Sequence, residues 1–122
     1  MATWHDIGNQ NLEAAKMLLT GSKFRSAASR AYYAAFAMVN EVFQRGGFMR
    51  GLRTPSHRMM PRLIEHTFSH LSMRRRWQLA GEYRELYALR IGADYQRGQT
   101  VNRQTALRAV KLAGLITIGC DL

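Results

Sequence analysis

The sequence predicts an all-α protein, an antiparallel up-and-down four-helix bundle with one extra short helix. Three observations lead to this prediction. Residues that favour helices, above all alanine, leucine, arginine and methionine, are abundant along the 122 residues. Apolar residues recur at helical spacing, without strand-like alternation or internal repeats. The only two prolines, Pro55 and Pro61, lie in the first half of the chain, and the connections between helices are short. Residues 1–122 are long enough for one domain but not for two.

The first helix is expected to begin near Thr3 or Asp6, either of which can cap it, and to end near Thr20. Its apolar stripe consists of Leu12, Ala15, Leu18 and Leu19. The segment "TGSK" ends this helix, with Gly21 as its stop and Ser22 as the cap of the next one.

Residues 23–45, "KFRSAASRAYYAAFAMVNEVFQR", have the strongest helical pattern in the chain. Apolar residues cover more than half of the helical wheel, and the aromatic residues Tyr32, Tyr33 and Phe36 are interpreted first of all as core. A helix that is apolar on more than one face is central to a bundle or shared with a second subunit. The narrow polar strip contains Ser26, Arg30, Tyr33, Asn40 and Glu41.

Three more helices are predicted after the basic loop of residues 46–56. The first is short, covers about residues 56–71, and has Ser56 as its cap and Pro61 near its first turn. The second covers residues 73–97 and is ended by Gly98. The last covers residues 102–119 and is capped by Thr100 or Asn102, with an apolar face made of Leu107, Val110, Gly114 and Thr117.

The helix over residues 73–97 carries an unexpected charged pair. Its apolar side is formed by Leu79, Ala80, Tyr83, Leu86, Tyr87 and Ala93, and its polar side by Arg74, Gln78, Glu85 and Gln96. Arg90 and Asp94, one turn apart, lie near the centre of the apolar side. An unpaired buried charge costs several kcal/mol, so Arg90 must be paired or face a cleft. The pair is therefore either an internal ion pair that fixes helix register or a cleft arginine that holds phosphate, oriented by Asp94.

The charge distribution points to a phosphate-bearing partner. The formal net charge is +10, carried by fifteen arginines and three lysines against eight acidic residues. Between Arg45 and Arg76, eight arginines face a single acidic residue, Glu65. Guanidinium groups bind phosphate oxygens bidentately, so this stretch predicts contact with nucleic acid or nucleotide, unless it is only a solvated surface. The arginines expected to bind nucleic acid are Arg30, Arg50, Arg53, Arg58 and Arg62.

Histidines and glycines offer no clear metal or phosphate-loop motif. His66 and His70 have the i, i+4 spacing of a zinc site, but no cysteine pair or H-E-x-x-H pattern accompanies them. Their basic neighbourhood repels cations, so no metal and no cofactor are expected. Gly46 and Gly47 lack the spacing of a phosphate-binding loop.

The sequence predicts a cytoplasmic protein that does not cross a membrane. The start, "MATWHDIGNQ", lacks the apolar segment of a signal peptide, and no apolar run is long enough to span a bilayer. The single cysteine, Cys120, cannot form an internal disulfide, which suits a reducing compartment.

Three segments together resemble the HEPN superfamily. They are "SAASRAYYAAFAMVNEVF" at residues 26–43, "TPSH" at residues 54–57 and "LRIGADY" at residues 89–95. They are similar to the small prokaryotic branch marked by A-x-x-R/S-x-Y-Y-A-x-F, then T-x-S/x-H, then R-x-x-A-D-Y. The resemblance covers about residues 15–113 and implies a helical bundle that usually dimerises, with its functional cleft near the two-fold axis. Many members are metal-independent endoribonucleases, often toxins encoded beside a minimal nucleotidyltransferase antitoxin; others bind nucleotides or are non-catalytic partners.

The chain departs from the family's nuclease signature, an arginine followed by four to six residues and then histidine. Counted from Arg90, the eligible positions are Tyr95, Gln96 and Arg97, and none is histidine. Proton transfer near neutral pH then needs another group. His57, the motif histidine of this branch, is the candidate; Tyr95 is a poorer one, because a phenol titrates near pH 10.

The resemblance and the residues together predict an RNA-binding homodimer with a basic cleft around Arg90, Asp94 and Tyr95, of the endoribonuclease toxin kind. In this interpretation Arg90 grips the scissile phosphate, Asp94 orients Arg90, and His57 moves protons. Two alternatives stay open. One is a non-catalytic nucleotide-binding or regulatory partner of a nucleotidyltransferase. The other is a structural dimer in which the ion pair only sets helix register.

Overall fold

The computed structural model describes residues 2–46, 55–95 and 101–121. Over these ranges the chain forms helices and no strand, which confirms the predicted fold class. The helices are α1 (Trp4–Thr20), α2 (Phe24–Arg45), α3 (Met60–Thr67), α4 (Met73–Tyr95) and α5 (Arg103–Asp121). Among them, none is both long enough and apolar enough to span a membrane.

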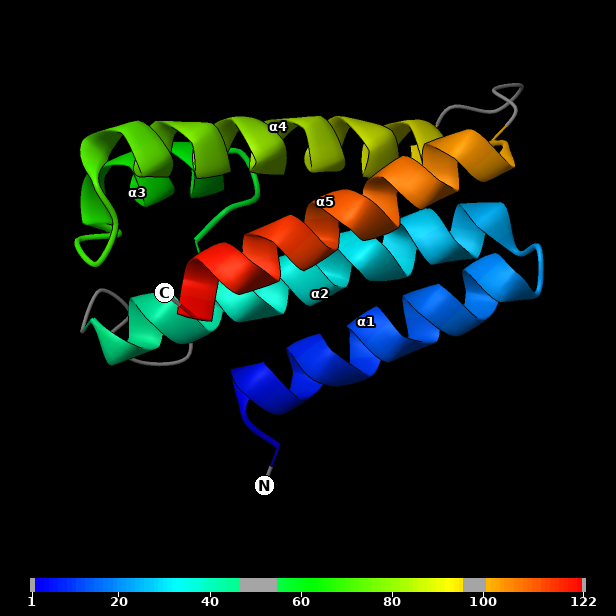
Figure 1. The fold of residues 1–122 in the computed structure, drawn as a ribbon, viewed down its shortest axis with the longest axis horizontal. Helices are drawn as coiled ribbons and strands as arrows, with labels where there is room; N and C mark the ends of the chain where they lie inside the picture. The colour runs from blue at the N-terminus through cyan, green and yellow to red at the C-terminus, as the bar shows by residue number, and fades with distance from the viewer. Residues whose placement is uncertain (1, 47–54, 96–100, 122) are drawn as a thin grey trace.

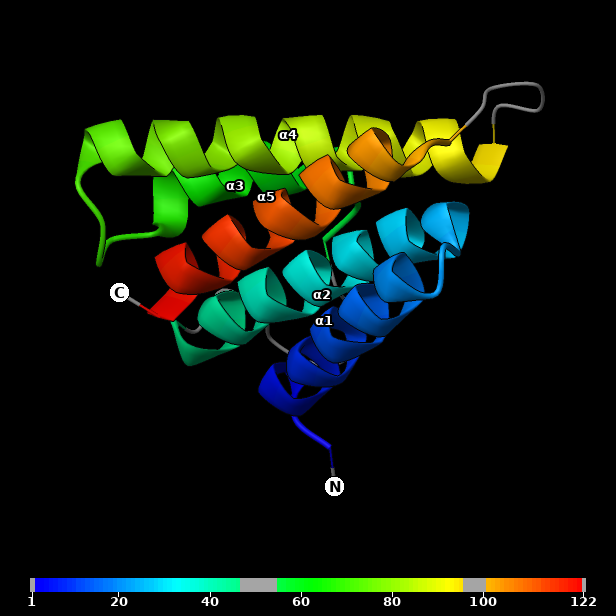
Figure 2. The same ribbon diagram turned by 45° about the vertical axis from the view of Figure 1, so that its right-hand side comes forward.

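Helix α2 lies at the centre of the bundle and packs against α1, α4 and α5, while the short α3 packs against α4 (Figure 1). The turned view in Figure 2 shows the same neighbours, with α1 and α4 on opposite sides of α2 and α5. Eleven of the twenty-two residues of α2 are buried, as its wide apolar surface predicted. At Gly8 a Cβ atom would come within 2.9 Å of the Met38 side chain, so this glycine allows α1 to approach α2 closely.

Helix α1 begins with a capping box. The Thr3 hydroxyl accepts a hydrogen bond from the Asp6 amide (3.0 Å), and the Asp6 carboxylate accepts one from the Thr3 amide (3.1 Å). Of the two predicted caps, Thr3 is the N-cap and Asp6 completes the box. Gly21 ends the helix as predicted. The predicted cap of α2 is wrong: Ser22 has a positive φ of 61° and turns the chain out of α1, and Lys23 becomes the N-cap without a side-chain bond.

The polar strip predicted on α2 is correct for Ser26, Arg30 and Tyr33, which are exposed, but wrong for Asn40. Asn40 is completely buried, and its Nδ2 donates to the Phe36 carbonyl one turn earlier (2.8 Å). The wheel position alone could not reveal this, because α2 is covered by neighbouring helices on more sides than a surface helix is.

Helix α3 is shorter than predicted. Residues 57–59 form a turn, so the helix begins at Met60 and its N-cap is Met59 rather than Ser56. Pro61 lies in the first turn, as expected. The helix ends at Thr67 because Phe68 leaves the helical conformation (ψ 67°) and inserts its fully buried ring edge-on against Phe43 at 5.7 Å.

The pattern of α4 is confirmed for Leu79, Ala80, Tyr83, Leu86 and Ala93, all of which are buried. The last predicted residues of this helix, 96 and 97, lie outside the described residues, as does Thr100. Asn102 caps α5 by accepting a hydrogen bond from the Thr105 amide (2.9 Å).

The predicted apolar face of α5 is wrong. Leu107 is 53% exposed, and Val110, Gly114 and Thr117 are only partly buried. The face that packs into the bundle consists of Ala106, Ala109, Leu112, Ala113 and Ile116. Helix α5 has two apolar faces, and the face richer in alanine packs against the alanine-rich α2, where small side chains let the two backbones approach.

Candidate functional site around Arg90

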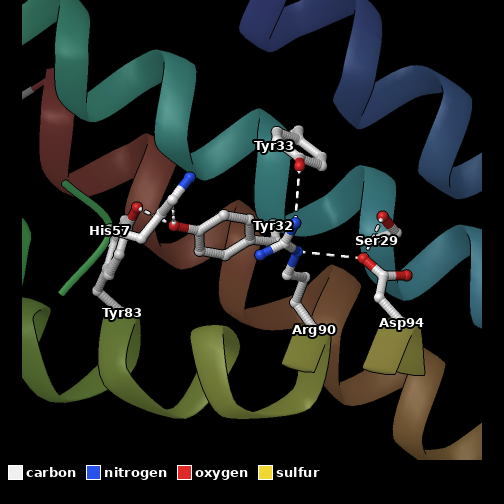
Figure 3. Close-up of polar contacts among 7 residues, drawn as sticks. All are labelled: Ser29, Tyr32, Tyr33, His57, Tyr83, Arg90 and Asp94. Atoms are coloured by element: carbon white, nitrogen blue, oxygen red, sulfur yellow. Dashed lines mark hydrogen bonds and ion pairs between the residues drawn. The ribbon is translucent and has the colours of Figure 1, made fainter. Parts of the chain in front are cut away.

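The Arg90 side chain lies inside the molecule, at 8% exposure, and is surrounded by acceptors and aromatic rings (Figure 3). Its Nε donates to Asp94 Oδ2 (3.1 Å) and its Nη2 donates to the Tyr33 hydroxyl (2.8 Å). The guanidinium carbon lies 5.4 Å from the ring centroid of Tyr32 and 5.2 Å from that of Tyr33. Cation–π contacts and charge-assisted hydrogen bonds offset the loss of hydration that burial imposes on the guanidinium group.

Asp94 links this arginine to the first half of α2. The Ser29 hydroxyl donates to Asp94 Oδ2 (3.2 Å), the same oxygen that accepts from Arg90. The Arg90 side chain is buried, whereas the Asp94 side chain is 25% exposed. The ion pair therefore contacts solvent only on the side of the Asp94 carboxylate. The predicted pairing of Arg90 with Asp94 is therefore present in the structure, with Ser29 and Tyr33 as further partners from α2.

Tyr32 is the centre of the hydrogen-bond network behind Arg90. Its hydroxyl is bonded to the Tyr83 hydroxyl (2.9 Å) and to His57 Nδ1, and its side chain is completely buried. If His57 Nδ1–H donates to the Tyr32 hydroxyl and Tyr32 donates to Tyr83, Nε2 of the neutral imidazole carries no proton and can accept one. Burial raises the pKa of Tyr32 and of Tyr83 well above the usual range for a phenol. Both hydroxyls are therefore protonated near neutral pH.

His57 lies in the turn three residues before α3 rather than at the helix start where it was predicted. Its ring packs 4.8 Å from Phe36 and almost parallel to Tyr87 at 6.1 Å. Burial, and in second place the positive charge of Arg90, lowers the pKa of His57 below its usual value. Near neutral pH the imidazole is thus uncharged and has one nitrogen that can accept a proton.

A pH dependence of stability follows from this shift. Because the pKa of His57 is lower in the folded than in the unfolded protein, the free energy of unfolding should be highest above about pH 6.5 and fall as the pH decreases through the folded pKa. Urea denaturation on both sides of this window should show the fall. It should be smaller in His57→Gln and unchanged in His66→Gln, which alters an exposed histidine. Equal falls in all three proteins would contradict the assignment to His57.

The other predicted site residues fall into two groups. Arg30, Arg58 and Arg62 are exposed, and Arg30 Nη1 donates to Asn11 Oδ1 across the α1–α2 interface (3.2 Å). Arg50 and Arg53 lie outside the described residues, as does the side chain of Tyr95. The structure thus brings Arg90, Asp94 and His57 into one network, while their chemical roles remain predictions.

The predicted helix over residues 56–71 would have placed His66 and His70 on one face, but α3 ends at Thr67 and His70 lies beyond it. His70 Nε2 is bonded to the Gly119 carbonyl of α5 (2.9 Å), which requires this nitrogen to donate. In the described ranges, no three histidine, cysteine or acidic side chains are grouped as a metal site would need.

Sequence reasoning missed Ser29, the Tyr33 hydroxyl and Tyr83. A weak signal existed for Tyr83, since it carries a polar hydroxyl on an otherwise apolar helix face and buried hydroxyls need a partner. The sequence places Tyr33 both in the polar strip and among the aromatic core residues. In the structure it is 37% exposed and belongs to the strip.

Comparison with known families gives a match over most of the chain. The model of the HEPN domain matches residues 1–117, nearly the whole chain. No curated protein matches the chain significantly.

Proposed function

Because the chain belongs to the HEPN domain family, we propose that it binds RNA in the cytoplasm and cleaves it as a metal-independent endoribonuclease. The observation that carries the proposal is the position of Tyr32. Its ring contacts the guanidinium of Arg90, and its hydroxyl is bonded to the imidazole of His57. A fixed cation and a neutral proton acceptor, 33 residues apart in the sequence, thus share one buried neighbour.

In this proposal Arg90 binds the scissile phosphate. The Tyr33 hydroxyl, which accepts from Arg90 Nη2, belongs to a residue that is 37% exposed. A phosphate oxygen is a stronger acceptor for a guanidinium than a neutral hydroxyl, and it takes the place of this oxygen when RNA binds. Asp94 keeps its bond to Nε and holds the plane of the guanidinium during the exchange.

The reaction is transesterification within the RNA strand. His57 takes the proton of the ribose 2′-hydroxyl, whose oxygen attacks the adjacent phosphorus. The bond from phosphorus to the 5′ oxygen breaks, and the products are a 2′,3′-cyclic phosphate and a 5′ hydroxyl. The 5′ oxygen takes its proton from a water molecule, and the hydroxide so formed is neutralised by the proton that His57 took up. Arg90 stabilises the negative charge that develops on the phosphoryl oxygens. A nuclease of this kind would act as the toxin of a toxin–antitoxin or defence system.

RNA affinity should depend strongly on salt and on exposed arginines. Each phosphate contact made to single-stranded RNA contributes about 0.7 to the slope of log K against log salt concentration. Replacing both Arg58 and Arg62 by glutamine should weaken binding for all RNA sequences and reduce that slope by about 1.4. Fluorescence anisotropy with labelled RNA over a series of salt concentrations measures both the affinity and its slope. The matched control, Arg103→Gln and Lys111→Gln together, removes two exposed cations of α5. The same loss in that control would reduce the proposal to non-specific attraction.

A second candidate function is a non-catalytic nucleotide-binding or regulatory partner of a minimal nucleotidyltransferase. The observation that favours it is the absence of histidine at positions 95–97, where the family's nuclease signature requires one. RNA or nucleotide binding without cleavage in EDTA, together with co-purification of a nucleotidyltransferase, would support this candidate and exclude the ribonuclease.

We also propose that the protein is a homodimer. Helix α5 exposes two large apolar side chains on one face, Leu107 at 53% and Ile118 at 57% exposure, and Leu107 belongs to the face predicted as core. Burying such a face against a second copy is favourable. Light scattering should give twice the chain mass of 14.0 kDa, and Leu107→Glu with Ile118→Glu should give the mass of one chain. A single-chain mass for the wild type would contradict the proposal.

A further inference from the structure

A groove next to Arg90 shares only Tyr33 with the mechanism above. It lies between α1 and α2, has a volume of about 320 Å³, and is lined by residues that include Trp4, Ile7, Asn11, Arg30, Tyr33 and Phe36. We infer that this groove binds a nucleobase, with guanine preferred, belonging to the RNA strand whose phosphate Arg90 holds. The inference rests on the proposed function, because it places the base beside the phosphate of the same strand.

The walls of the groove have the chemistry of a base-stacking site. Phe36 is flanked edge-on by Trp4, with ring centroids 6.2 Å apart, and by Tyr33 at 6.5 Å. All three rings are at least partly exposed. Single-stranded RNA is bound by stacking unpaired bases on aromatic side chains and on arginine guanidinium planes. The volume lies at the lower end of the range for ligand sites, so it suits one base and not a longer segment.

Arg30 gives the groove a preference among bases. Its Nη1 donates to Asn11 Oδ1 (3.2 Å), while Asn11 Nδ2 donates to the Ile7 carbonyl (2.9 Å). The amide of Asn11 is therefore engaged by the protein, and it fixes the guanidinium at the edge of the groove. A guanidinium offers only donors, and the base edge that matches it best is that of guanine, with O6 and N7 as acceptors.

The groove is continuous with the phosphate site through two residues of α2. Tyr33 lines the groove, and its hydroxyl accepts from Arg90 Nη2 (2.8 Å). Ser29 also lines the groove, and its hydroxyl donates to Asp94 (3.2 Å). A phosphate that displaces the Tyr33 hydroxyl therefore carries its nucleotide to the mouth of the groove. Figure 3 shows Tyr33, Arg90, Asp94 and Ser29 beside one another, with α1, in dark blue, above them in the view.

The test uses the fluorescence of Trp4. The chain has two tryptophans, and Trp77 is exposed at the start of α4, so Trp77→Phe leaves Trp4 as the only tryptophan reporter. The probes are 5′-GMP, 5′-AMP, guanosine and ribose 5-phosphate. We expect 5′-GMP to quench Trp4 with the lowest dissociation constant and ribose 5-phosphate to leave the fluorescence unchanged. Equal quenching by 5′-GMP and ribose 5-phosphate, or no quenching by any base, would overturn the inference.

Two variants separate this inference from the proposed function. Arg30→Gln should weaken 5′-GMP at least tenfold and 5′-AMP less, whereas the control Arg103→Gln, at the exposed start of α5, should change neither. Equal weakening of both nucleotides would overturn the guanine preference. Arg90→Ala should weaken 5′-GMP but not guanosine. If guanosine binds and Arg90→Ala has no effect on the affinity for 5′-GMP, the base-binding groove is supported and the phosphate site at Arg90 is contradicted. If RNA binding requires Arg90 but none of the probes changes the fluorescence of Trp4, the phosphate site is supported and the base-binding groove is contradicted.

Discussion

Replacing Arg90 by lysine is expected to lower the rate of RNA cleavage in EDTA by about 100- to 1000-fold, the usual effect of removing one group that stabilises transition-state charge. Lysine keeps the positive charge but lacks the planar guanidinium group, which donates from Nε to Asp94 and from Nη2 to the Tyr33 hydroxyl at the same time. The shorter reach and single ammonium of lysine cannot hold Asp94 and a phosphate oxygen in the same plane. Cleavage of end-labelled RNA, followed by separation of the fragments, measures the rate.

The matched control is Arg84→Lys, which makes the same change on the same helix at an exposed position paired with Glu65. It should cleave RNA at the wild-type rate. Circular dichroism of both variants verifies that the helices are intact. Wild-type cleavage by Arg90→Lys would mean that the charge alone suffices and that the fork geometry has no catalytic role. No cleavage by the wild type would move the assignment to the binding or regulatory candidate.

The parts of the fold that sequence could predict include the central position of α2, which its wide apolar surface indicated, and the buried face of α4. In α4, Leu79 and Leu86 are buried at the expected positions. Helix α5 is the opposite case, because Leu107 and Ile116 lie on two different apolar faces. A helical wheel cannot show which of these two faces packs against α2. That choice depends on how closely the alanines of the two helices approach, which is a property of the packed pair.

The short-range errors have a similar origin. Ser22 and Ser56 are residues that often cap helices, yet the caps are Lys23 and Met59. Ser22 belongs to the turn that ends α1, where its φ is 61° and its amide bonds the Leu19 carbonyl. The helix that follows Ser56 ends early because Phe68 leaves it to reach the core. Cap propensities contribute about 1 kcal/mol, less than the burial of one aromatic ring, so tertiary packing overrides them.

The candidate site could be predicted only where its residues are close in the sequence. Arg90 and Asp94 are one helical turn apart, so their pairing was visible on the wheel. Ser29, Tyr33 and His57 join them from 33 to 65 residues away, as contacts between α2, α4 and the turn before α3. The position of Tyr32 between Arg90 and His57 is a result of helix packing, and no single-segment pattern encodes it.

Asp94→Ala alone should lower the free energy of unfolding by several kcal/mol, up to the roughly 3–5 kcal/mol found when one partner of a buried ion pair is removed. The Arg90 side chain, at 8% exposure, would then keep its charge without the carboxylate that accepts from Nε. The double variant Arg90→Met with Asp94→Leu removes both charges. It should unfold at least as late in urea as the wild type, because methionine packs well against the rings of Tyr32 and Tyr33.

RNA binding by the double variant distinguishes a role of the Arg90–Asp94 pair in phosphate recognition from a purely structural role. If the double variant is as stable as the wild type and no longer binds RNA, the charges are not needed for folding, and phosphate recognition is the property that requires them. If it is stable and still binds RNA with unchanged affinity, the pair only sets the register of α4 against α2 and the phosphate site must lie elsewhere. A double variant as unstable as Asp94→Ala would show that Tyr33 and Ser29 depend on the pair for their own hydrogen bonds. Each result assigns the buried charge to a different physical role, and stability and affinity must be measured on the same three proteins for the assignment to be made.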